Sequence, residues 1–478
     1  MIKLHELTIR KVHELLTKKE VSSFELIKEF LEYIEERDKE IGAYLRVFHD
    51  EALKQANEID KKIAAGEEID LLAGVPVAIK DNILIKDTPS TAASKILKNY
   101  QATYDATVIK KLKKAGAIFL GKTNLDEFAM GSSTENSAFQ LTKNPLDETR
   151  VPGGSSGGSA SAVASHQAVC ALGSDTGGSI RQPAAFCGLV GLKPTYGAVS
   201  RFGLIAMASS LDQIGPITKT VEDAALILER IAGEDPSDAT SLPFNFNFKE
   251  LEKITDLKKI RIGVIKECFE QNLEPDLKNA IDKSIKLLKS LGAEIDEVSI
   301  PHIAASLACY YIIMPAEVSA NLARYDGLRY ASKEISGSLK ELYFKNRGEN
   351  FGREVRRRIL LGTFVLSSGY YDAYYLKAKK VQKLISDEFE RAFQKYQLLL
   401  SPTAPTSAFK LGEKINDPLA MYLSDIFTVP ANIAGLPAIS LPVYENNKLP
   451  YALQLMAPPF KERDLLAASL LFEKISAK

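Results

Sequence analysis

Two segments rich in glycine and serine hold most of the side chains that could perform chemistry. The first runs from Gly153 to Ser159 as GGSSGGS, and the second runs from Gly173 to Ser179 as GSDTGGS. Each precedes a run compatible with a helix, at 160–165 and 180–186. A glycine-rich turn that opens a helix gathers free backbone N–H groups, which suit an anion or a developing oxyanion. These features favour a hydrolytic site that uses a serine over a pair of flexible linkers.

A serine nucleophile needs a base, and the histidines are poorly placed to supply one. Gly153–Gly157 matches the G-x-S-x-G pattern, in which Ser155 would be the nucleophile and a histidine would follow it. Of the five histidines only His166 and His302 come after Ser155 in the sequence. A Ser-His-Asp triad is therefore hard to build from this chain.

Lys80 is the alternative base. It follows the apolar run Val75–Ile79, which predicts a short buried strand and places an amine at the edge of a core. Burial disfavours the ammonium form and lowers the pKa of a lysine, so such an amine can accept a proton. The proton of one serine could reach Lys80 through a second serine. The residue pattern leaves open whether Ser155 or Ser179 is the nucleophile.

The sequence Gly116–Thr123 satisfies the P-loop pattern in its letters but not in its context. A P-loop needs a flexible loop between its glycines. Here a predicted helix, Thr107–Ala115, ends at Gly116, and Ala117–Leu120 predicts a strand. We therefore prefer a helix cap, a strand and a turn to a nucleotide site.

No metal site is expected, because the histidines and cysteines are scattered and no H-x-x-x-H pair occurs. The cysteines show no C-x-x-C pair and are typical of small apolar core residues in a reducing compartment. They are Cys170, Cys187, Cys268 and Cys309.

Helix and strand signals alternate along the chain and indicate an α/β fold. Ser22 and Glu25 form a predicted capping box for a helix that runs to about Arg37. The segment 310–395 is rich in helix signals. The other expected elements are strands at 169–173, 260–265, 294–300, 398–400, 438–441 and 452–455, with a helix at 277–291 between two of them. We expect a single large domain, 1–478, with a central mixed sheet covered by helices on both faces.

The composition excludes several broad classes of protein. Among 478 residues, 61 Lys and Arg balance 61 Asp and Glu, so the formal net charge is zero. A chain without net charge has no general electrostatic attraction for nucleic acid or an anionic membrane. The hydrophobic share of 45% is that of a globular protein. The first twenty residues lack the apolar core of a signal peptide, and we found no apolar stretch of membrane-helix length. We expect a cytoplasmic chain without a membrane partner.

The combination of these motifs resembles the amidase signature family. The two glycine-serine segments carry this resemblance, together with Val77–Asn82 and Gly191–Thr195. It extends over nearly the whole chain, has its core at about 70–200, and implies the fold of that family. It implies that Ser179 is the nucleophile, Ser155 a bridging serine held by a cis peptide bond, and Lys80 the base. The implied oxyanion hole comprises the N–H groups of Thr176, Gly177, Gly178 and Ser179.

Within the family, the chain is similar to glutaminase subunits of tRNA-dependent amidotransferases. The segments that carry this similarity are Gly121–Gly131, Tyr310–Glu317, Asn321–Gly327 and Tyr422–Thr428. It implies that Arg358 and Asp425 hold the amino acid head of glutamine and that Tyr310 lines the pocket. Two alternatives apply to the arginine: a neighbour of Arg358 in the run Arg356–Arg358 could bind the substrate instead, or the run could be a solvated basic helix face. Asp425 could instead cap a helix.

The same similarity implies partners. Ammonia released from glutamine would pass to a B subunit, which uses ATP and Mg²⁺ to convert Glu-tRNA(Gln) into Gln-tRNA(Gln), or Asp-tRNA(Asn) into Asn-tRNA(Asn). A small C subunit would complete a heterotrimer, the B subunit would bind most of the tRNA, and this chain would need no cofactor of its own. The alternatives are a free-standing amidase that acts on other small amides and a non-catalytic scaffold.

Overall fold

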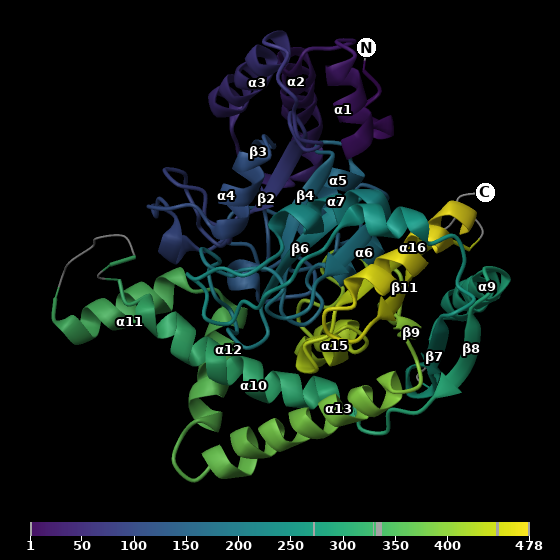
Figure 1. The fold of residues 1–478 in the computed structure, drawn as a ribbon. Helices are drawn as coiled ribbons and strands as arrows, with labels where there is room; N and C mark the ends of the chain where they lie inside the picture. Colours follow the sequence, from purple (N-terminus) through teal and green to yellow (C-terminus); the bar gives the residue numbers. More distant parts are fainter. Residues whose placement is uncertain (1, 271–272, 328, 331–336, 446–448, 477–478) are drawn as a thin grey trace.

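An eleven-stranded mixed sheet forms the centre of the molecule in this computed structural model, which describes residues 2–270, 273–327, 329–330, 337–445 and 449–476 (Figure 1). The strand order is β1-β3-β2-β4-β6-β5-β10-β11-β9-β7-β8. The strands are β1 (Tyr44–Val47), β2 (Pro76–Lys80), β3 (Ile118–Thr123), β4 (Cys170–Asp175), β5 (Val190–Lys193), β6 (Gln213–Thr218), β7 (Arg261–Ile265), β8 (Glu294–Val298), β9 (Leu398–Pro402), β10 (Ala438–Val443) and β11 (Tyr451–Met456).

The sheet mixes parallel and antiparallel pairs, as predicted. Strand β2 runs parallel to both β3 and β4, and β7 runs parallel to β8 and β9. The β7–α9–β8 connection confirms the expected strand, helix and strand, with α9 at Pro275–Ser290. Strands β1, β5 and β6 had no clear sequence signal. Two of them contain Gly191, Gly215 and Pro216, which weaken a strand pattern although both strands are buried in the sheet.

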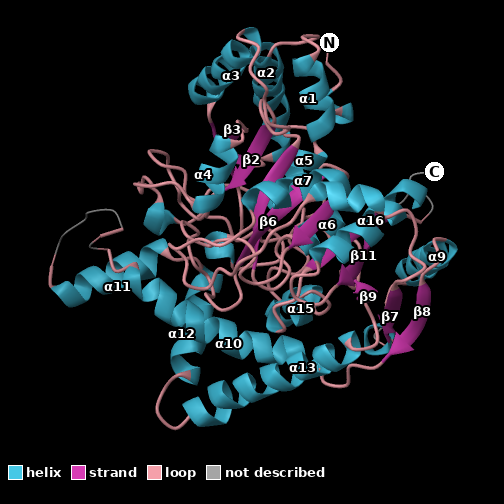
Figure 2. Ribbon diagram, viewed as in Figure 1, coloured by secondary structure: helices cyan, strands magenta, loops and turns pink. Residues whose placement is uncertain are grey.

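Helices flank the sheet, and Figure 2 separates them from the strands by colour. Besides α9, the helices are α1 (Ile9–Thr17), α2 (Ser23–Ile41), α3 (His49–Ala64), α4 (Thr107–Lys114), α5 (Gly157–Ala164), α6 (Arg181–Phe186), α7 (Val221–Ile231), α8 (Lys266–Phe269), α10 (Ser306–Asn321), α11 (Leu339–Asn350), α12 (Arg353–Val365), α13 (Lys377–Phe393), α14 (Pro418–Tyr422), α15 (Val429–Ile433) and α16 (Glu462–Ser476). A π-helix, η7 (Tyr371–Leu376), leads into α13, and the 3₁₀-helix η8 (Leu423–Asp425) follows α14.

Helix α2 begins with the predicted capping box and runs further than predicted. The Ser22 Oγ accepts the Glu25 N–H at 3.1 Å, and the Glu25 carboxylate accepts the Ser22 N–H at 2.9 Å. The helix continues beyond Arg37 because Ile41 extends its buried face. It stops at Gly42, whose φ of +68° is the left-handed conformation that glycine adopts at a helix C-terminus.

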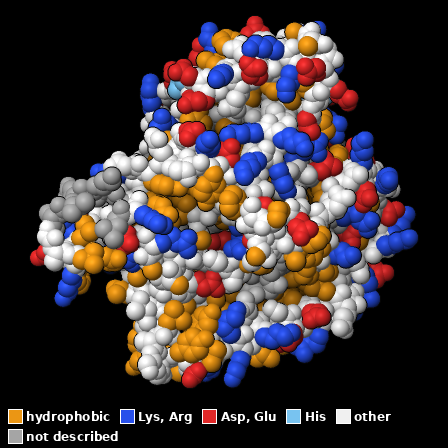
Figure 3. All heavy atoms as spheres, turned by 60° about the vertical axis from the view of Figure 1, so that its left-hand side comes forward, with side chains coloured by type: hydrophobic (Ala, Val, Ile, Leu, Met, Phe, Trp, Pro, Cys, Tyr) orange, Lys and Arg blue, Asp and Glu red, His pale blue; other side chains and the backbone are white. Residues whose placement is uncertain are grey.

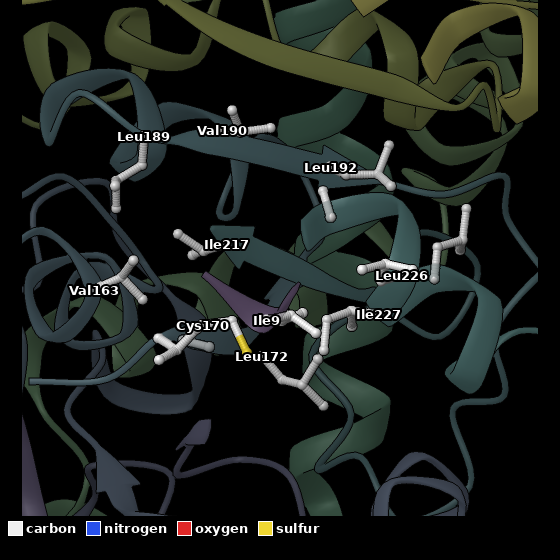
Figure 4. Close-up of a cluster of buried hydrophobic side chains, with 14 of the residues drawn as sticks. Ile9, Val163, Cys170, Leu172, Leu189, Val190, Leu192, Ile217, Leu226 and Ile227 are labelled. Atoms are coloured by element: carbon white, nitrogen blue, oxygen red, sulfur yellow. The ribbon is translucent and has the colours of Figure 1, made fainter. Parts of the chain in front are cut away.

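The two sides of β9 face different hydrophobic cores. On β9, Leu398 and Leu400 join one core and Leu399 joins the other, as the two-residue period of a strand requires. Figure 4 shows part of the first core, where Cys170 lies among side chains of β4, β6 and α7. All four cysteines are buried and free, as expected of small apolar core residues.

A helical layer built from α10, α12 and α13 covers the lower part of the molecule in Figure 1. This layer accounts for the helix-rich segment that the sequence indicates at 310–395. Contrary to the expectation from the sequence, one stretch, Ile303–Arg324, is long and apolar enough to cross a membrane, but half of that apolar window is buried inside the fold. Because α10 packs against α12, α13 and α15, its apolar character serves the core.

Candidate active site

Lys80 and Ser155 form a buried hydrogen-bonded pair. Lys80 is the last residue of β2, and Ser155 lies in the glycine-serine turn before α5. The Lys80 Nζ lies 2.8 Å from the Ser155 Oγ, and neither side chain has any exposed surface. The Gly154–Ser155 peptide bond is cis, as the family resemblance implies for this position.

Two further serines surround the Lys80 amine. The Nζ lies 2.8 Å from the Ser156 Oγ and 2.9 Å from the Ser174 Oγ, and the Asn82 amide donates to the Ser174 Oγ at 2.9 Å. The sequence patterns assigned no role to these three residues. Ser156 and Ser174 could have been considered because they lie in the two glycine-serine segments. Asn82 ends the segment Val77–Asn82 that carries the family resemblance, but its partner Ser174 becomes its neighbour only in the folded sheet.

Burial lowers the pKa of Lys80 from its usual value to about 7. Asp126, Asp175 and Asp212 oppose this shift but do not cancel it. A substantial fraction of the amine is therefore neutral near pH 7. A neutral amine within hydrogen-bond distance of a serine hydroxyl has the arrangement of a general base.

Ser179 lies in the turn between β4 and α6. Its exposed fraction is 8%, whereas Lys80 and Ser155 have none. Within the described part of the chain, no side chain or backbone group hydrogen-bonds the Ser179 hydroxyl. The Ser156 N–H donates to the Ser179 carbonyl at 3.2 Å and joins the two glycine-serine segments. The structure therefore brings the three predicted segments together and leaves the Ser179 hydroxyl accessible.

The turn around Ser179 presents unused backbone donors. The N–H groups of Thr176, Gly177 and Ser179 donate to no other described group. The Gly178 N–H differs from the expectation, because it donates to the Asp175 carboxylate at 2.8 Å. Three N–H groups, rather than the four implied by the resemblance, are thus free to face a developing negative charge.

Steric contacts explain the two glycines of this turn. A Cβ on Gly177 would lie 2.8 Å from the Tyr310 ring. A Cβ on Gly178 would lie 2.1 Å from the Thr428 Oγ1, and its φ of +138° is one that residues with a side chain rarely adopt. Only glycine lets the backbone approach these neighbours so closely.

Asp175 holds the turn in place through a network of hydrogen bonds. Besides Gly178, its carboxylate accepts the Ile180 N–H at 3.2 Å, both Nε and Nη2 of Arg181, and the Asn432 amide at 2.9 Å. Burial favours the neutral acid, but the Arg181 charge and these donors together bring the pKa of Asp175 down to about 2. The turn therefore rests on a permanent buried ion pair.

Arg358 is the buried member of the arginine run. It keeps 2% of its surface exposed, whereas Arg356 is exposed and Arg357 is partly exposed. Its Nε donates to the Glu354 carboxylate at 2.8 Å, and its guanidinium lies 5.4 Å from the centre of the Tyr311 ring. The structure thus distinguishes Arg358 from its neighbours, which the sequence pattern alone did not.

Asp425 has an unpaired buried oxygen. Its Oδ2 accepts the Ser132 hydroxyl at 2.5 Å, and its Oδ1 has no partner among the described residues although it is buried. Its side chain caps no helix, which removes the simplest structural explanation. Burial raises the pKa of Asp425 to about 7, against the opposing effects of Ser132 and Arg358. Asp425 adjoins the turn of Ser179 through Thr428, whose hydroxyl bonds to the Gly177 carbonyl at 2.7 Å and the Asp425 carbonyl at 3.1 Å. The Tyr310 ring lies against Gly177 of the same turn.

The competing motifs have ordinary structural roles. The residues between Gly116 and Lys122 form β3, so they provide no phosphate-binding loop. The His166 ring lies beside His5, and the His302 side chain contacts Glu388, so neither ring is placed to activate Ser155. Across the described ranges, no group of three or more His, Cys, Asp or Glu could hold a metal ion.

The chain is similar to known proteins over nearly its whole length. The amidase family matches residues 25–466. The A subunit of glutamyl-tRNA(Gln) amidotransferase from Carboxydothermus hydrogenoformans is 56% identical over 474 residues, which cover 99% of this chain and 98% of that protein. The corresponding protein from Microcystis aeruginosa is 54% identical over 469 residues, covering 98% of this chain and 97% of that protein. The crystal structure of the corresponding protein from Thermotoga maritima has a TM-score of 0.81 and 45% identity, covering 100% of this chain and 96% of that one. The chain therefore belongs to the amidase family.

Proposed function

We propose that this chain is the glutaminase subunit of a glutamyl-tRNA(Gln) amidotransferase. The observation that carries this proposal is the joint presence of the buried Lys80–Ser155 pair, the accessible Ser179, and the charged pair Arg358 and Asp425 beside Tyr310. The first group suits amide hydrolysis. The second suits a substrate that carries one negative and one positive charge, as the head of free glutamine does.

The proposed reaction begins with a proton relay. Lys80 accepts the proton of Ser155, Ser155 accepts that of Ser179, and the Ser179 Oγ attacks the carboxamide carbon of glutamine. The unused N–H groups of Thr176, Gly177 and Ser179 stabilise the resulting oxyanion. The relayed proton returns to the nitrogen, ammonia leaves, and an acyl-enzyme remains. A water molecule then attacks the ester and releases glutamate.

Substrate recognition uses the two charged groups. Arg358 pairs with the α-carboxylate and Asp425 accepts the α-ammonium, for which its Oδ1 has no competing partner among the described groups. Tyr310 lines the pocket next to Gly177. The substrate is neutral overall, in keeping with a chain whose formal net charge is zero.

We also propose partners and a compartment. The ammonia would pass to a B subunit that uses ATP and Mg²⁺ to amidate Glu-tRNA(Gln), or Asp-tRNA(Asn), and a C subunit would complete a cytoplasmic heterotrimer. This chain would bring no cofactor and would meet tRNA mainly through the B subunit. Exposed apolar side chains between α12 and α13 support a protein partner, and Figure 3 shows hydrophobic side chains gathered at this lower end of the molecule. These residues, which we call the apolar patch, are Leu360, Phe364, Tyr370, Tyr371 and Tyr374.

The test is glutamine hydrolysis by the assembled complex after Ser179→Ala or Lys80→Met. Each change removes one step of the relay and should lower kcat by at least roughly 10²-fold. Ser165→Ala is the matched control, because this buried serine bonds only to the Ser161 carbonyl at the far end of α5. Near-normal turnover in either relay variant would contradict the mechanism. Brisk hydrolysis of simple amides by the chain alone, without any on glutamine, would instead indicate a free-standing amidase.

A further inference from the structure

Glu354 lies one helical turn before Arg358 on α12 and uses both of its oxygens. The Oε1 accepts the Arg358 Nε at 2.8 Å and the Tyr422 hydroxyl at 2.8 Å. The Oε2 accepts an N–H of Arg357. The side chain is buried, so these bonds form away from bulk water, where a charged hydrogen bond is strong.

The bond to Glu354 determines which edge of the Arg358 guanidinium is available. With the Nε occupied, the outer edge formed by Nη1 and Nη2 remains. The Nη1 has only the Met314 sulfur, at 3.7 Å, and the Nη2 has no hydrogen-bond partner in the described ranges. That outer edge can bind a carboxylate through two parallel hydrogen bonds.

The same carboxylate connects α12 to the segment that carries Asp425. Tyr422 ends α14, and Asp425 follows one turn later at the end of η8. The Tyr422 ring stacks on that of Tyr311, with 3.9 Å between the centroids, and Arg358 lies 5.5 Å from it. The hydrogen bond from Tyr422 to Glu354 therefore connects the segment that carries Asp425 to α12, the helix that carries Arg358.

We propose that Glu354 is a positioning residue that restricts this site to amides with a free amino acid head. It presents the outer edge of Arg358 to the α-carboxylate and sets the spacing between Arg358 and Asp425. This inference rests on the proposed glutaminase function and deepens it, because neither Glu354 nor Tyr422 touches the amide that is cleaved.

The experiment compares two readouts in the assembled complex that carries Glu354→Gln. The first is the KM and kcat for glutamine. The second is the rate at which phenylmethylsulfonyl fluoride modifies Ser179, because this reagent has no amino acid head. We expect the KM to rise about tenfold, since hydrogen bonds between charged groups are lost, while kcat and the modification rate change less than about threefold. The glutamine concentration that protects Ser179 from modification should rise with the KM.

Two variants complete the design. Tyr422→Phe keeps the ring and removes only its hydroxyl, so it should raise the KM by a smaller factor without altering Ser179 modification, even if Glu354→Gln folds poorly. Glu388→Gln is the control, because this buried glutamate of α13 contacts His302 and no residue of the site, so both readouts should stay unchanged.

The outcomes separate this inference from the function on which it rests. If the complex with the natural sequence does not hydrolyse glutamine, both the proposed function and the positioning role of Glu354 are wrong. A complex that hydrolyses glutamine, with an unchanged KM in both Glu354→Gln and Tyr422→Phe, overturns the positioning role alone. An equal loss of glutamine turnover and of Ser179 modification would also overturn it, because that result describes general damage to the site.

Discussion

Two lysines show that the neighbours of a buried amine, and not burial itself, decide its chemistry. Burial lowers the pKa of both Lys80 and Lys193 to about 7. The Lys193 amine, however, donates to the Pro194 carbonyl, whereas the Lys80 amine meets three serine hydroxyls. Only Lys80 is therefore placed to accept a proton from a nucleophile.

This difference predicts the pH dependence of the reaction. Lys80 accepts a proton only when it is neutral, and Asp425, whose pKa is also about 7, binds the ammonium only when it is ionised. At saturating glutamine the bound ammonium keeps Asp425 ionised, so kcat should fall about tenfold per pH unit as the pH drops below about 7, and level off above it. The measurement is kcat of the assembled complex at saturating glutamine between about pH 5.5 and 9. Lys193→Met should keep the inflection. A profile that is flat through pH 7, or an inflection that disappears with Lys193, would contradict Lys80 as the base.

The site residues that the sequence predicted are those within recognisable motifs. Lys80, Ser155 and Ser179 fall in contiguous segments, and physical reasoning alone left two serines as candidate nucleophiles. The roles of Asn82, although it lies in the segment of Lys80, and of Glu354 were missed for a different reason. Their partners, Ser174 and Arg358, become informative only when the distance and the buried environment are known.

At the scale of elements, the turn between β4 and α6 combines an ion pair with two tight backbone contacts. Asp175 and Arg181 anchor its two ends, and Gly178 passes against Thr428. Small changes in this turn must therefore move the N–H groups that face the site.

Gly178→Ala tests this close packing. The new Cβ would meet the Thr428 Oγ1 in a strained conformation, so we expect a loss of stability of about 3 kcal/mol or more and a strong loss of activity. Gly66→Ala is the matched control, because its φ is also positive at +73° but nothing lies within 4 Å of its Cβ. The control should cost about 1 kcal/mol and keep activity. Thermal denaturation of both variants measures the difference, and equal Tm values would contradict the steric argument.

The sequence predicted elements better than it predicted their arrangement. Capping and periodicity located α2, β2, β4 and α9 within a few residues. The order of eleven strands depends on contacts between distant segments, which no local pattern encodes. Strands β5 and β6 were not predicted because their glycine and proline residues weaken the local strand pattern. They form because both strands are buried in the sheet, where packing outweighs local propensity.

At the scale of the whole molecule, the apolar patch is a surface that an isolated chain would expose to water at a cost in free energy. The rings of Phe364, Tyr370 and Tyr374 contact one another, with 4.4 Å between the centroids of Phe364 and Tyr370, yet they remain open to water. An exposed cluster of this kind is typical of an interface.

Leu360→Ser and Phe364→Ser test whether the patch binds a partner protein. Both should weaken copurification with the B and C subunits at least about tenfold, because each removes apolar area from the interface. The stability of the isolated chain should change by less than about 0.5 kcal/mol, since both residues are exposed. Leu339→Ser changes an exposed leucine on α11 outside the patch and should assemble normally. Unchanged recovery of the complex in both patch variants would place the interface elsewhere.

The position of the site residues along the chain has an evolutionary consequence. The hydrolytic group comes from β2, the glycine-serine turn and the β4–α6 turn, between Lys80 and Ser179. The groups that we propose for substrate recognition come from α10, α12 and η8, between Tyr310 and Asp425. Changes in the segment between Tyr310 and Asp425 can therefore alter the substrate during evolution, while the nucleophile and its base stay the same.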